Sequence, residues 1–346
     1  MSDTELMNPL RGAGLPAQPG LADGDLVTDA AAPRALYAQC PKAHETPLAD
    51  AAALAAEVGV GALWLKDERG RMGLGSFKAL GAAHAIAKAW VAAGENLEGV
   101  TFATASAGNH GLSVAAGARA FGAKAVIYIA DTVPEAFADR LRAMGADVAR
   151  EGAAYEAAMA AAQRDAAANG WRLLSDSSWE GYADPARDVM EGYLIMGAEA
   201  AEQVPEAPTH IYLQAGVGGL AAAACAAARA AWGDGPRITV VEPDAARALI
   251  ESIRAGRPLF TDGPVSNMGR LDCKEPSHLA LKYLAREADA FMTVTDAEAQ
   301  MAADRLGASG FATTPSAAAG FAGMAKDAPG PEARVLLYVS EGPEDA

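Results

Sequence analysis

The segment that decides the fold is residues 100–121, which read VTFATASAGNHGLSVAAGARAF. Its first six residues are apolar or β-branched, as in a buried strand, and its last ten are Ala-rich and helical in pattern. Strand patterns and helix patterns continue to alternate further along the chain, at residues 125–129, 134–144, 155–168 and 171–174. This alternation predicts the βαβ units of a parallel α/β sheet.

A second alternating series follows in the C-terminal half of the chain. Strand patterns rich in Ile, Val and Leu stand at residues 211–214, 238–241 and 335–339. Helix patterns lie between them, in the Ala-rich run after Gly219 and at residues 245–253. The chain is therefore predicted to form two α/β units, and no short repeat indicates a solenoid.

We predict two domains, each a largely parallel sheet flanked by helices. The small domain covers residues 99–179, and the large domain combines residues 36–98 with residues 180–346. Residues 1–35 are rich in Gly, Pro, Asp and Ala without sustained periodicity, so we expect an irregular N-terminal arm there.

The composition argues against several classes of function. A formal charge of −16 leaves no excess of Lys and Arg that would bind a nucleic acid. Cys40, Cys225 and Cys273 are far apart in the chain, which indicates neither a disulfide framework nor a thiolate metal site. The first residues are acidic, and no apolar stretch is long enough to span a bilayer. We therefore expect a cytoplasmic protein without a bound metal, a nucleic-acid partner or a membrane anchor.

One lysine stands in a setting that suits covalent chemistry. Lys78 follows Gly73 and Gly75 and lies at the predicted start of a helix among apolar residues. Burial at this place would lower the pKa of the Lys78 amine, and a neutral amine can act as a nucleophile. The alternative is an ordinary solvated lysine at a helix start.

The loop at residues 104–111 joins a predicted strand to a predicted helix. Its backbone N–H groups are expected to face an anion, such as the carboxylate of a substrate. The candidate substrate contacts in this loop are Ser106, Ala107, Gly108 and His110. The alternative is an ordinary loop in which Ser or Asn caps the following helix.

Residues 214–220 read QAGVGGL and join a predicted strand to an Ala-rich helix. Glycine has no Cβ, so a phosphate can approach the backbone closely here. Ala221 replaces the last glycine of a dinucleotide fingerprint, and no Gly-Lys-Ser/Thr follows, which disfavours a dinucleotide site and a P-loop. The backbone predicted to hold the phosphate belongs to Gly216, Val217, Gly218, Gly219 and Leu220.

These three segments, in this order, resemble the fold type II enzymes that depend on pyridoxal 5′-phosphate (PLP). That family includes threonine and serine dehydratases, serine racemase and the tryptophan synthase β chain, and the resemblance runs from Thr46 to the last predicted strand. The likeness is strongest to the diaminopropionate ammonia-lyases. It is carried by residues 66–68 (KDE), 76–81 (SFKALG), 176–182 (DSSWEGY), 214–218 (QAGVG), 241–243 (VEP), 273–276 (CKEP) and 341–342 (EG).

The resemblance implies a role for each of several residues in binding PLP. Lys78 would be the Schiff-base lysine with Phe77 beside it, and Asn109 would hydrogen-bond the ring hydroxyl. The loop at residues 216–220 would hold the phosphate, and Ser340 would face the pyridine nitrogen. A neutral hydroxyl there leaves the nitrogen largely unprotonated, which favours quick β-elimination over chemistry that needs a long-lived carbanion.

Three further residues bear on specificity. The resemblance makes Asp176 a second acid/base group or a contact to the β-substituent of the substrate, and a helix cap is the alternative. Ala107 stands where the ammonia-lyases carry Asp and serine racemase carries Ser. A methyl group cannot transfer a proton, so we expect only L-amino acids as substrates. Pro315 stands in a segment where the ammonia-lyases carry Gly-Glu-Ser, which removes an acid near the cofactor.

We therefore expect a PLP-dependent lyase, homodimeric by family likeness, that removes the α-proton and β-substituent of a small L-amino acid. L-2,3-diaminopropionate is the first candidate substrate, and the products would be a 2-oxo acid and ammonia. A dehydratase that acts on threonine, serine or 3-hydroxyaspartate is the alternative among enzymes. A non-catalytic protein that binds a phosphorylated ligand at Gly216 is the alternative from another class.

Overall fold

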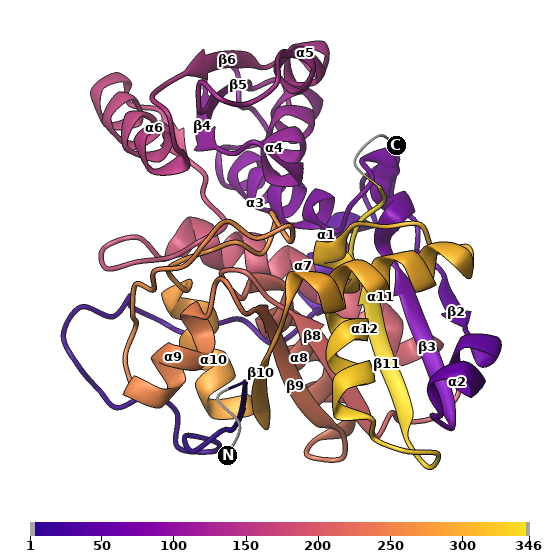
Figure 1. Ribbon diagram of the computed structural model, residues 1–346. Helices are drawn as coiled ribbons and strands as arrows, with labels where there is room; N and C mark the ends of the chain where they lie inside the picture. The colour runs from indigo at the N-terminus through magenta and orange to yellow at the C-terminus, as the bar shows by residue number, and fades with distance from the viewer. Residues whose placement is uncertain (1–3, 344–346) are drawn as a thin grey trace.

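The computed structural model describes residues 4–343 and contains two sheets with helices around them (Figure 1). The larger sheet has seven strands in the order β1-β10-β9-β8-β11-β3-β2, and its inner pairs are all parallel. The smaller sheet has four parallel strands in the order β6-β5-β4-β7. The prediction of an α/β fold with parallel sheets is confirmed.

The seven-stranded sheet draws its strands from both ends of the chain. Its edge strands β1 and β2 pair antiparallel with their neighbours. The strands, in the order of the sheet, are β1 (Glu5–Met7), β10 (Ala290–Val294), β9 (Arg237–Pro243), β8 (His210–Gln214), β11 (Arg334–Val339), β3 (Ala62–Asp67) and β2 (Leu48–Asp50).

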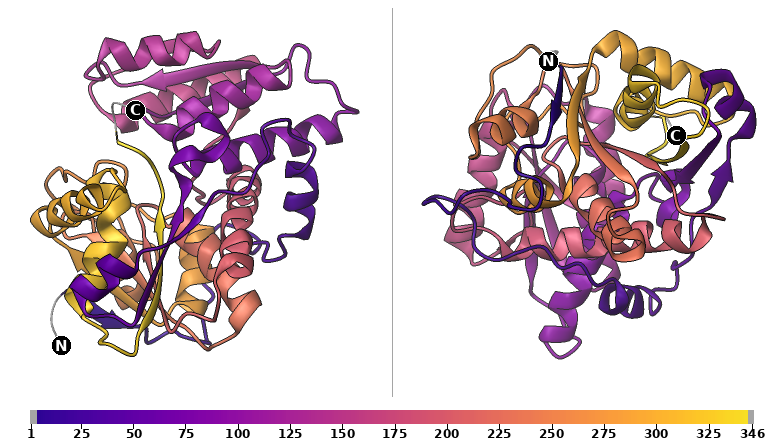
Figure 2. Two further views of the ribbon diagram at one scale, coloured as in Figure 1. Left: turned by 90° about the vertical axis from the view of Figure 1, so that its right-hand side faces the viewer. Right: turned by 90° about the horizontal axis from the view of Figure 1, so that it is seen from below.

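The smaller sheet stands apart from the larger one, above it in Figure 1 and again in the left view of Figure 2. It carries the helices α4 (Asn109–Ala120), α5 (Glu135–Ala143) and α6 (Tyr155–Asn169). Its strands are β6 (Asp147–Arg150), β5 (Lys124–Ile129), β4 (Thr101–Ala105) and β7 (Arg172–Leu173).

The larger sheet is buried on both faces because its strand residues alternate between two apolar layers. In β11, Leu336 and Tyr338 face one layer, whereas Val335, Leu337 and Val339 face the other. The first layer contains α3 (Lys78–Ala92), α7 (Asp184–Gln203), α8 (Gly219–Trp232) and α10 (His278–Glu287). The second layer contains α2 (Ala52–Val58), α11 (Asp296–Ala308) and α12 (Pro315–Asp327).

The expectation of an irregular arm over residues 1–35 is wrong in two places. β1 adds to the edge of the larger sheet, and α1 (Ala31–Tyr37) begins within the range. Asn8 follows β1, and its side-chain amide donates to the carbonyls of Ala285 and Ala288 at the end of α10. Pairing with a strand almost 300 residues away leaves no local pattern in the sequence.

Two helices begin three residues away from their predicted starts. α4 begins at Asn109 rather than at residue 112, directly after the loop. α9 (Ala248–Ala255) begins three residues later than predicted, where the buried Glu242 carboxylate accepts hydrogen bonds from the N–H groups of Leu249 and Ile250. Glu242 lies on β9, seven residues before Leu249, so the preceding strand supplies this cap rather than the residue directly before the helix.

Candidate active site

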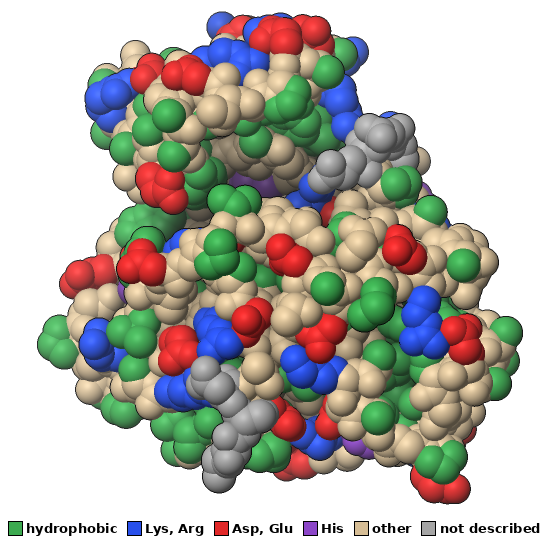
Figure 3. All heavy atoms as spheres, in the orientation of Figure 1, with side chains coloured by type: hydrophobic (Ala, Val, Ile, Leu, Met, Phe, Trp, Pro, Cys, Tyr) green, Lys and Arg blue, Asp and Glu red, His purple; other side chains and the backbone are tan. Residues whose placement is uncertain are grey.

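Lys78 and Asp176 face each other at a cleft between the two sheets. Lys78 is the first residue of α3, and its Nζ forms an ion pair with Oδ2 of Asp176. Both side chains keep about a fifth of their surface exposed, at 23% and 20%. The molecular surface is hollowed between the smaller sheet and the rest of the protein (Figure 3).

The charge state of Lys78 differs from the one that its sequence setting predicts. Burial alone lowers the pKa of the Lys78 amine, but the Asp176 carboxylate outweighs burial and raises that pKa above its ordinary value. The Lys78 ammonium in turn holds the pKa of Asp176 below its ordinary value, against the effect of burial. The prediction of a neutral lysine is therefore wrong for this state. The residues around Lys78 could not indicate its charged partner, because Asp176 lies 98 residues away in the sequence.

Aromatic side chains surround the Lys78 amine. Its Nζ lies 5.3 Å from the ring centroid of Phe77 and 5.7 Å from that of Tyr193 on α7. The two rings are tilted against each other, with centroids 4.8 Å apart. Burial raises the pKa of the Tyr193 hydroxyl, so Tyr193 stays neutral. Tyr193 is a site residue that sequence reasoning missed, because a tyrosine within a buried helix face has the pattern of a core residue.

The loop before α4 uses part of its hydrogen-bonding capacity internally. Ser106 Oγ accepts from the backbone N–H groups of Gly108 and Gly111, so the expectation that the loop amides face an anion is wrong for these two. Ala107 is exposed at the tip of the loop. Asn109 donates from its side-chain amide to Glu341.

His110 is buried, and its Nε2 lies 2.9 Å from the carbonyl oxygen of Leu174. A carbonyl only accepts, so Nε2 carries the proton and Nδ1 does not. Burial lowers the pKa of His110, which keeps the ring neutral. The predicted contact between His110 and a substrate stays a prediction.

The glycine-rich loop after β8 has the geometry of an anion site. Gly218 has a φ of +101° and stands directly before α8, and no side chain caps the first turn of that helix. A Cβ on Gly216 would lie 2.9 Å from Cys273 Sγ and 3.0 Å from Leu271 Cα, so only glycine fits. The first-turn N–H groups and the dipole of α8 are thus left available to an anion. These residues fit the phosphate of PLP.

The segment after β11 lies beside the lysine segment. The Ser340 carbonyl accepts from the Phe77 N–H at 3.0 Å, and Gly342 N–H donates to the Gly75 carbonyl at the same distance. Ser340 is buried, and the next residue, Glu341, contacts Asn109. The structure therefore brings Ser340, Asn109 and Lys78 to one place.

Two further residues of this region were not predicted from the sequence. Arg270, in the loop between α9 and α10, forms an ion pair with Glu341 in which Nε lies 2.7 Å from Oε2. Thr314 caps α12 and donates to the other carboxylate oxygen of Glu341. Pro315 is the first residue of α12 and follows Thr314. The position at which this chain differs from the ammonia-lyases is therefore one residue away from a partner of Glu341.

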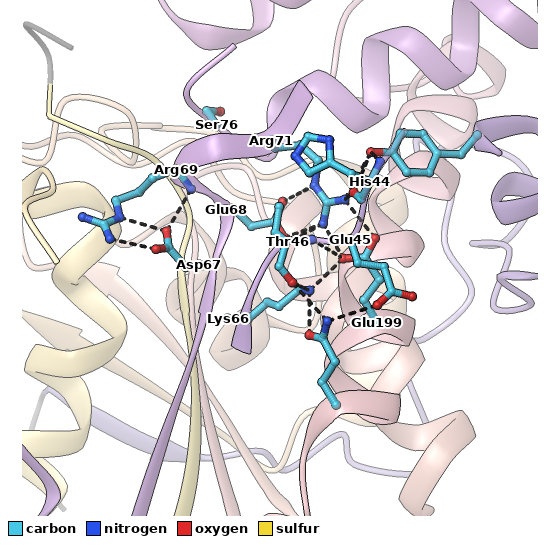
Figure 4. Close-up of polar contacts among 12 residues, drawn as sticks. His44, Glu45, Thr46, Lys66, Asp67, Glu68, Arg69, Arg71, Ser76 and Glu199 are labelled. Atoms are coloured by element: carbon cyan, nitrogen blue, oxygen red, sulfur yellow. Dashed lines mark hydrogen bonds and ion pairs between the residues drawn. The ribbon is translucent and has the colours of Figure 1, made fainter. Parts of the chain in front are cut away.

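A buried network of charges supports the segment that leads to Lys78 (Figure 4). Arg71 lies in η1 (Glu68–Gly73), which joins β3 to the lysine segment, and its Nη2 donates to Glu68 at 2.7 Å and to Glu199 at 2.6 Å. Lys66 on β3 donates to the same oxygen of Glu199 at 2.7 Å. All four side chains are at most 2% exposed. The network ties β3 and η1 to α7.

Two kinds of feature are absent from the part of the chain that the structure describes. Within residues 4–343, no helix is long and apolar enough to cross a membrane. In the same range, no three His, Cys, Asp or Glu side chains are grouped in a way that could hold a metal ion.

Known proteins resemble this chain in sequence and in fold. The chain is 32% identical over 288 residues to a diaminopropionate ammonia-lyase of Salmonella typhimurium, covering 76% of this chain and 71% of that protein. It is 29% identical over 259 residues to an L-threonine ammonia-lyase of Thermotoga maritima, covering 74% of this chain and 60% of that protein.

Among solved structures, a diaminopropionate ammonia lyase from Escherichia coli, in complex with an aminoacrylate-PLP azomethine reaction intermediate, matches with a TM-score of 0.85. The two are 28% identical, over 98% of this chain and 93% of that chain. The family model described as "Pyridoxal-phosphate dependent enzyme" matches residues 41–341. Together with the lysine at the cleft and the fitted glycine loop, this match shows that the chain belongs to the family of pyridoxal-phosphate dependent enzymes.

Proposed function

We propose that this protein is a PLP-dependent ammonia-lyase that removes the α-proton and the β-amino group of L-2,3-diaminopropionate. The observation that carries the proposal is the Asp176 carboxylate paired with Lys78 at the cleft. A carboxylate at this place suits a substrate with a positively charged β-ammonium group. The similarity to diaminopropionate ammonia-lyases over most of the chain supports the same substrate.

Lys78 and Asp176 would have separate roles in the reaction. Bound PLP would supply the electron sink that acidifies the α-C–H bond of an amino acid. A β-ammonium group beside Asp176 would replace the Lys78 ammonium as the counter-ion of that carboxylate, and the pKa of Lys78 would then fall. The neutral Nζ of Lys78 would take the α-proton, and the β-nitrogen would leave as ammonia. The product, 2-aminoacrylate, is hydrolysed by water to pyruvate and a second ammonia.

The other contacts to the cofactor follow the family pattern. The first-turn N–H groups of α8, with Gly216 to Leu220, would hold the phosphate. Asn109 would donate to the ring hydroxyl. Ser340, buried at the end of β11, would place a neutral hydroxyl at the pyridine nitrogen. Asn109 begins α4, whereas Ser340 and the loop before α8 directly follow strands of the larger sheet.

We predict that Gly218→Val weakens PLP binding at least about tenfold, because relief of roughly 1–2 kcal/mol of backbone strain at φ +101° would move the N–H groups of the phosphate loop out of place. A Cβ at this position would also lie 3.1 Å from the Ala280 Cβ. The dissociation constant of PLP is measured by titration of its absorbance.

Gly233→Val is the matched control for this variant. Gly233 ends the same helix, also has a positive φ (+58°), and has open space where its Cβ would stand. It carries the strain without touching the phosphate loop, so its PLP affinity should equal that of the unmodified protein. Equal affinities for all three proteins would place the phosphate elsewhere.

We predict that only L-amino acids turn over. Lys78 serves one face of the α-carbon, and Ala107, in the loop that faces the cofactor in this family, offers a methyl group to the other. Ala107→Asp should confer detectable release of 2-oxo acid from D-2,3-diaminopropionate. Comparable rates for the D- and L-enantiomers with the unmodified protein would contradict the prediction, since Asp176 or another group would then reach the second face.

A substrate panel distinguishes the remaining functions. A dehydratase of threonine, serine or 3-hydroxyaspartate is the second candidate, and the likeness to a threonine ammonia-lyase favours it. Release of 2-oxo acid and ammonia is measured for each amino acid, and two ammonia per 2-oxo acid identify diaminopropionate. A non-catalytic phosphate-binding protein would be colourless, whereas bound PLP gives a yellow band that borohydride removes.

We further propose that the enzyme works in the cytoplasm as a homodimer. Cys40, Cys225 and Cys273 are free thiols, which suits a reducing compartment. Two-fold dimers are the commonest closed assemblies of soluble enzymes. Light scattering coupled to size-exclusion chromatography measures the mass directly.

A further inference from the structure

Glu341 lies where four segments of the chain meet. Its Oε2 accepts from the Asn109 side chain and from Arg270, and its Oε1 accepts from the Thr314 hydroxyl. Its backbone bridges to Ser76, two residues before Lys78. Only 5% of the side chain is exposed. A buried carboxylate with hydrogen bonds on both oxygens is held in one orientation.

The contact with Glu341 decides which way the Asn109 carboxamide points. A carboxylate only accepts hydrogen bonds, so Asn109 must present its NH₂ group to Oε2. Only one of the two N–H bonds of that group is used in this contact. The second N–H of Asn109 is thereby turned in a fixed direction, instead of exchanging places with the carbonyl oxygen.

Arg270 offsets the cost of burying the Glu341 carboxylate. Burying an unpaired carboxylate is costly, and a charged partner offsets the cost. The Arg270 side chain is 31% exposed, so its guanidinium keeps part of its hydration while it pairs with Glu341. Glu341 can therefore stay ionised and keep its role as an acceptor.

We propose that Glu341 is a positioning residue that aims the Asn109 amide at the ring oxygen of PLP. The inference rests on the proposed function only in taking Asn109 as the residue beside that oxygen. Glu341 joins α4, which belongs to the smaller sheet, to the strand end that carries Ser340. One carboxylate thus links the helix that carries Asn109 to the segment that carries Ser340.

The test is the pH dependence of the absorbance of bound PLP. An N–H donor stabilises negative charge on the ring oxygen, so loss of the aimed donor raises the pH midpoint of the absorbance change. Glu341→Gln, which keeps the shape of the side chain but lets Asn109 turn over, should raise that midpoint by about one unit, equivalent to a tenfold change. Asn109→Ala should raise it at least as much, and the double variant should match Asn109→Ala alone.

Two further variants complete the experiment. Glu341→Asp keeps the charge but withdraws the carboxylate by one methylene, so it should shift the midpoint in the same direction. Glu57→Gln changes an exposed carboxylate that pairs with Arg305 far from the cleft, and should leave the midpoint unchanged.

Additive shifts in the Glu341→Gln, Asn109→Ala double variant would overturn the proposal. So would an unchanged midpoint in Glu341→Gln with loss of thermal stability alone, since Glu341 would then only hold the two parts together. The readout needs bound PLP but no substrate. A failure of the proposed substrate would appear in the 2-oxo acid assay and leave this test intact.

Discussion

Replacement of Lys78 by alanine is expected to lower the release of 2-oxo acid at least about 1,000-fold. The variant loses the amine that, in the proposed function, would take the α-proton and would also hold PLP at the cleft. The yellow band that borohydride fixes to the protein should disappear as well. Steady-state rates and absorbance after reduction and dialysis measure the two losses.

Lys124→Ala is the control for this variant. Lys124 is exposed at the start of β5, so its removal should change neither the rate nor the absorbance. Retention of a borohydride-fixed band in Lys78→Ala would assign the cofactor to another lysine. Lys78→Ala also leaves Asp176 without its main counter-charge, so the pKa of the Asp176 carboxyl should rise.

Glu199→Ala is expected to lower the free energy of unfolding by about 3–5 kcal/mol. Glu199 accepts from both Lys66 and Arg71, and its loss leaves two buried cations short of a partner. Urea unfolding followed by circular dichroism gives the change. PLP binding should weaken too, because Arg71 precedes the lysine segment on the same connection.

An exposed ion pair provides the comparison for Glu199→Ala. Glu57 pairs with Arg305 at 2.6 Å, but their side chains are 55% and 40% exposed. Glu57→Ala should therefore cost less than about 1 kcal/mol. Equal losses for the two variants would mean that the network below Lys78 contributes no more than a surface pair.

The parts of the fold that depend on local periodicity could be predicted from the sequence. β4 and β5 are short apolar runs, and the helices that follow them are Ala-rich, so both patterns are complete within a few residues. β6 was missed because Asp147 to Arg150 form a partly exposed edge strand with no apolar run. β1 was missed because its three residues depend on pairing with β10.

The candidate site, like the fold, could be predicted only where local sequence patterns determine it. The positions of Lys78 and of the Gly216 loop follow from the order of strand, loop and helix, which the sequence displays directly. The partners of these groups come from distant segments: Asp176 from beyond β7, Tyr193 from within α7, and Arg270 from a long loop. The direction of the pKa shift of Lys78 depends on Asp176, so it could not be predicted from the residues around Lys78 alone.

The central position of β11 has a consequence for how the protein is made. β8 and β3 each pair with β11 and not with each other, yet both leave the ribosome before it, at a pace of about 5–20 residues per second. The two halves of the larger sheet therefore cannot be joined until β11 has been synthesised. Ser340 and Glu341 follow β11 directly, so a nascent chain gains a continuous sheet and the segment that pairs with Phe77 and Ser76 in the same step of its biogenesis.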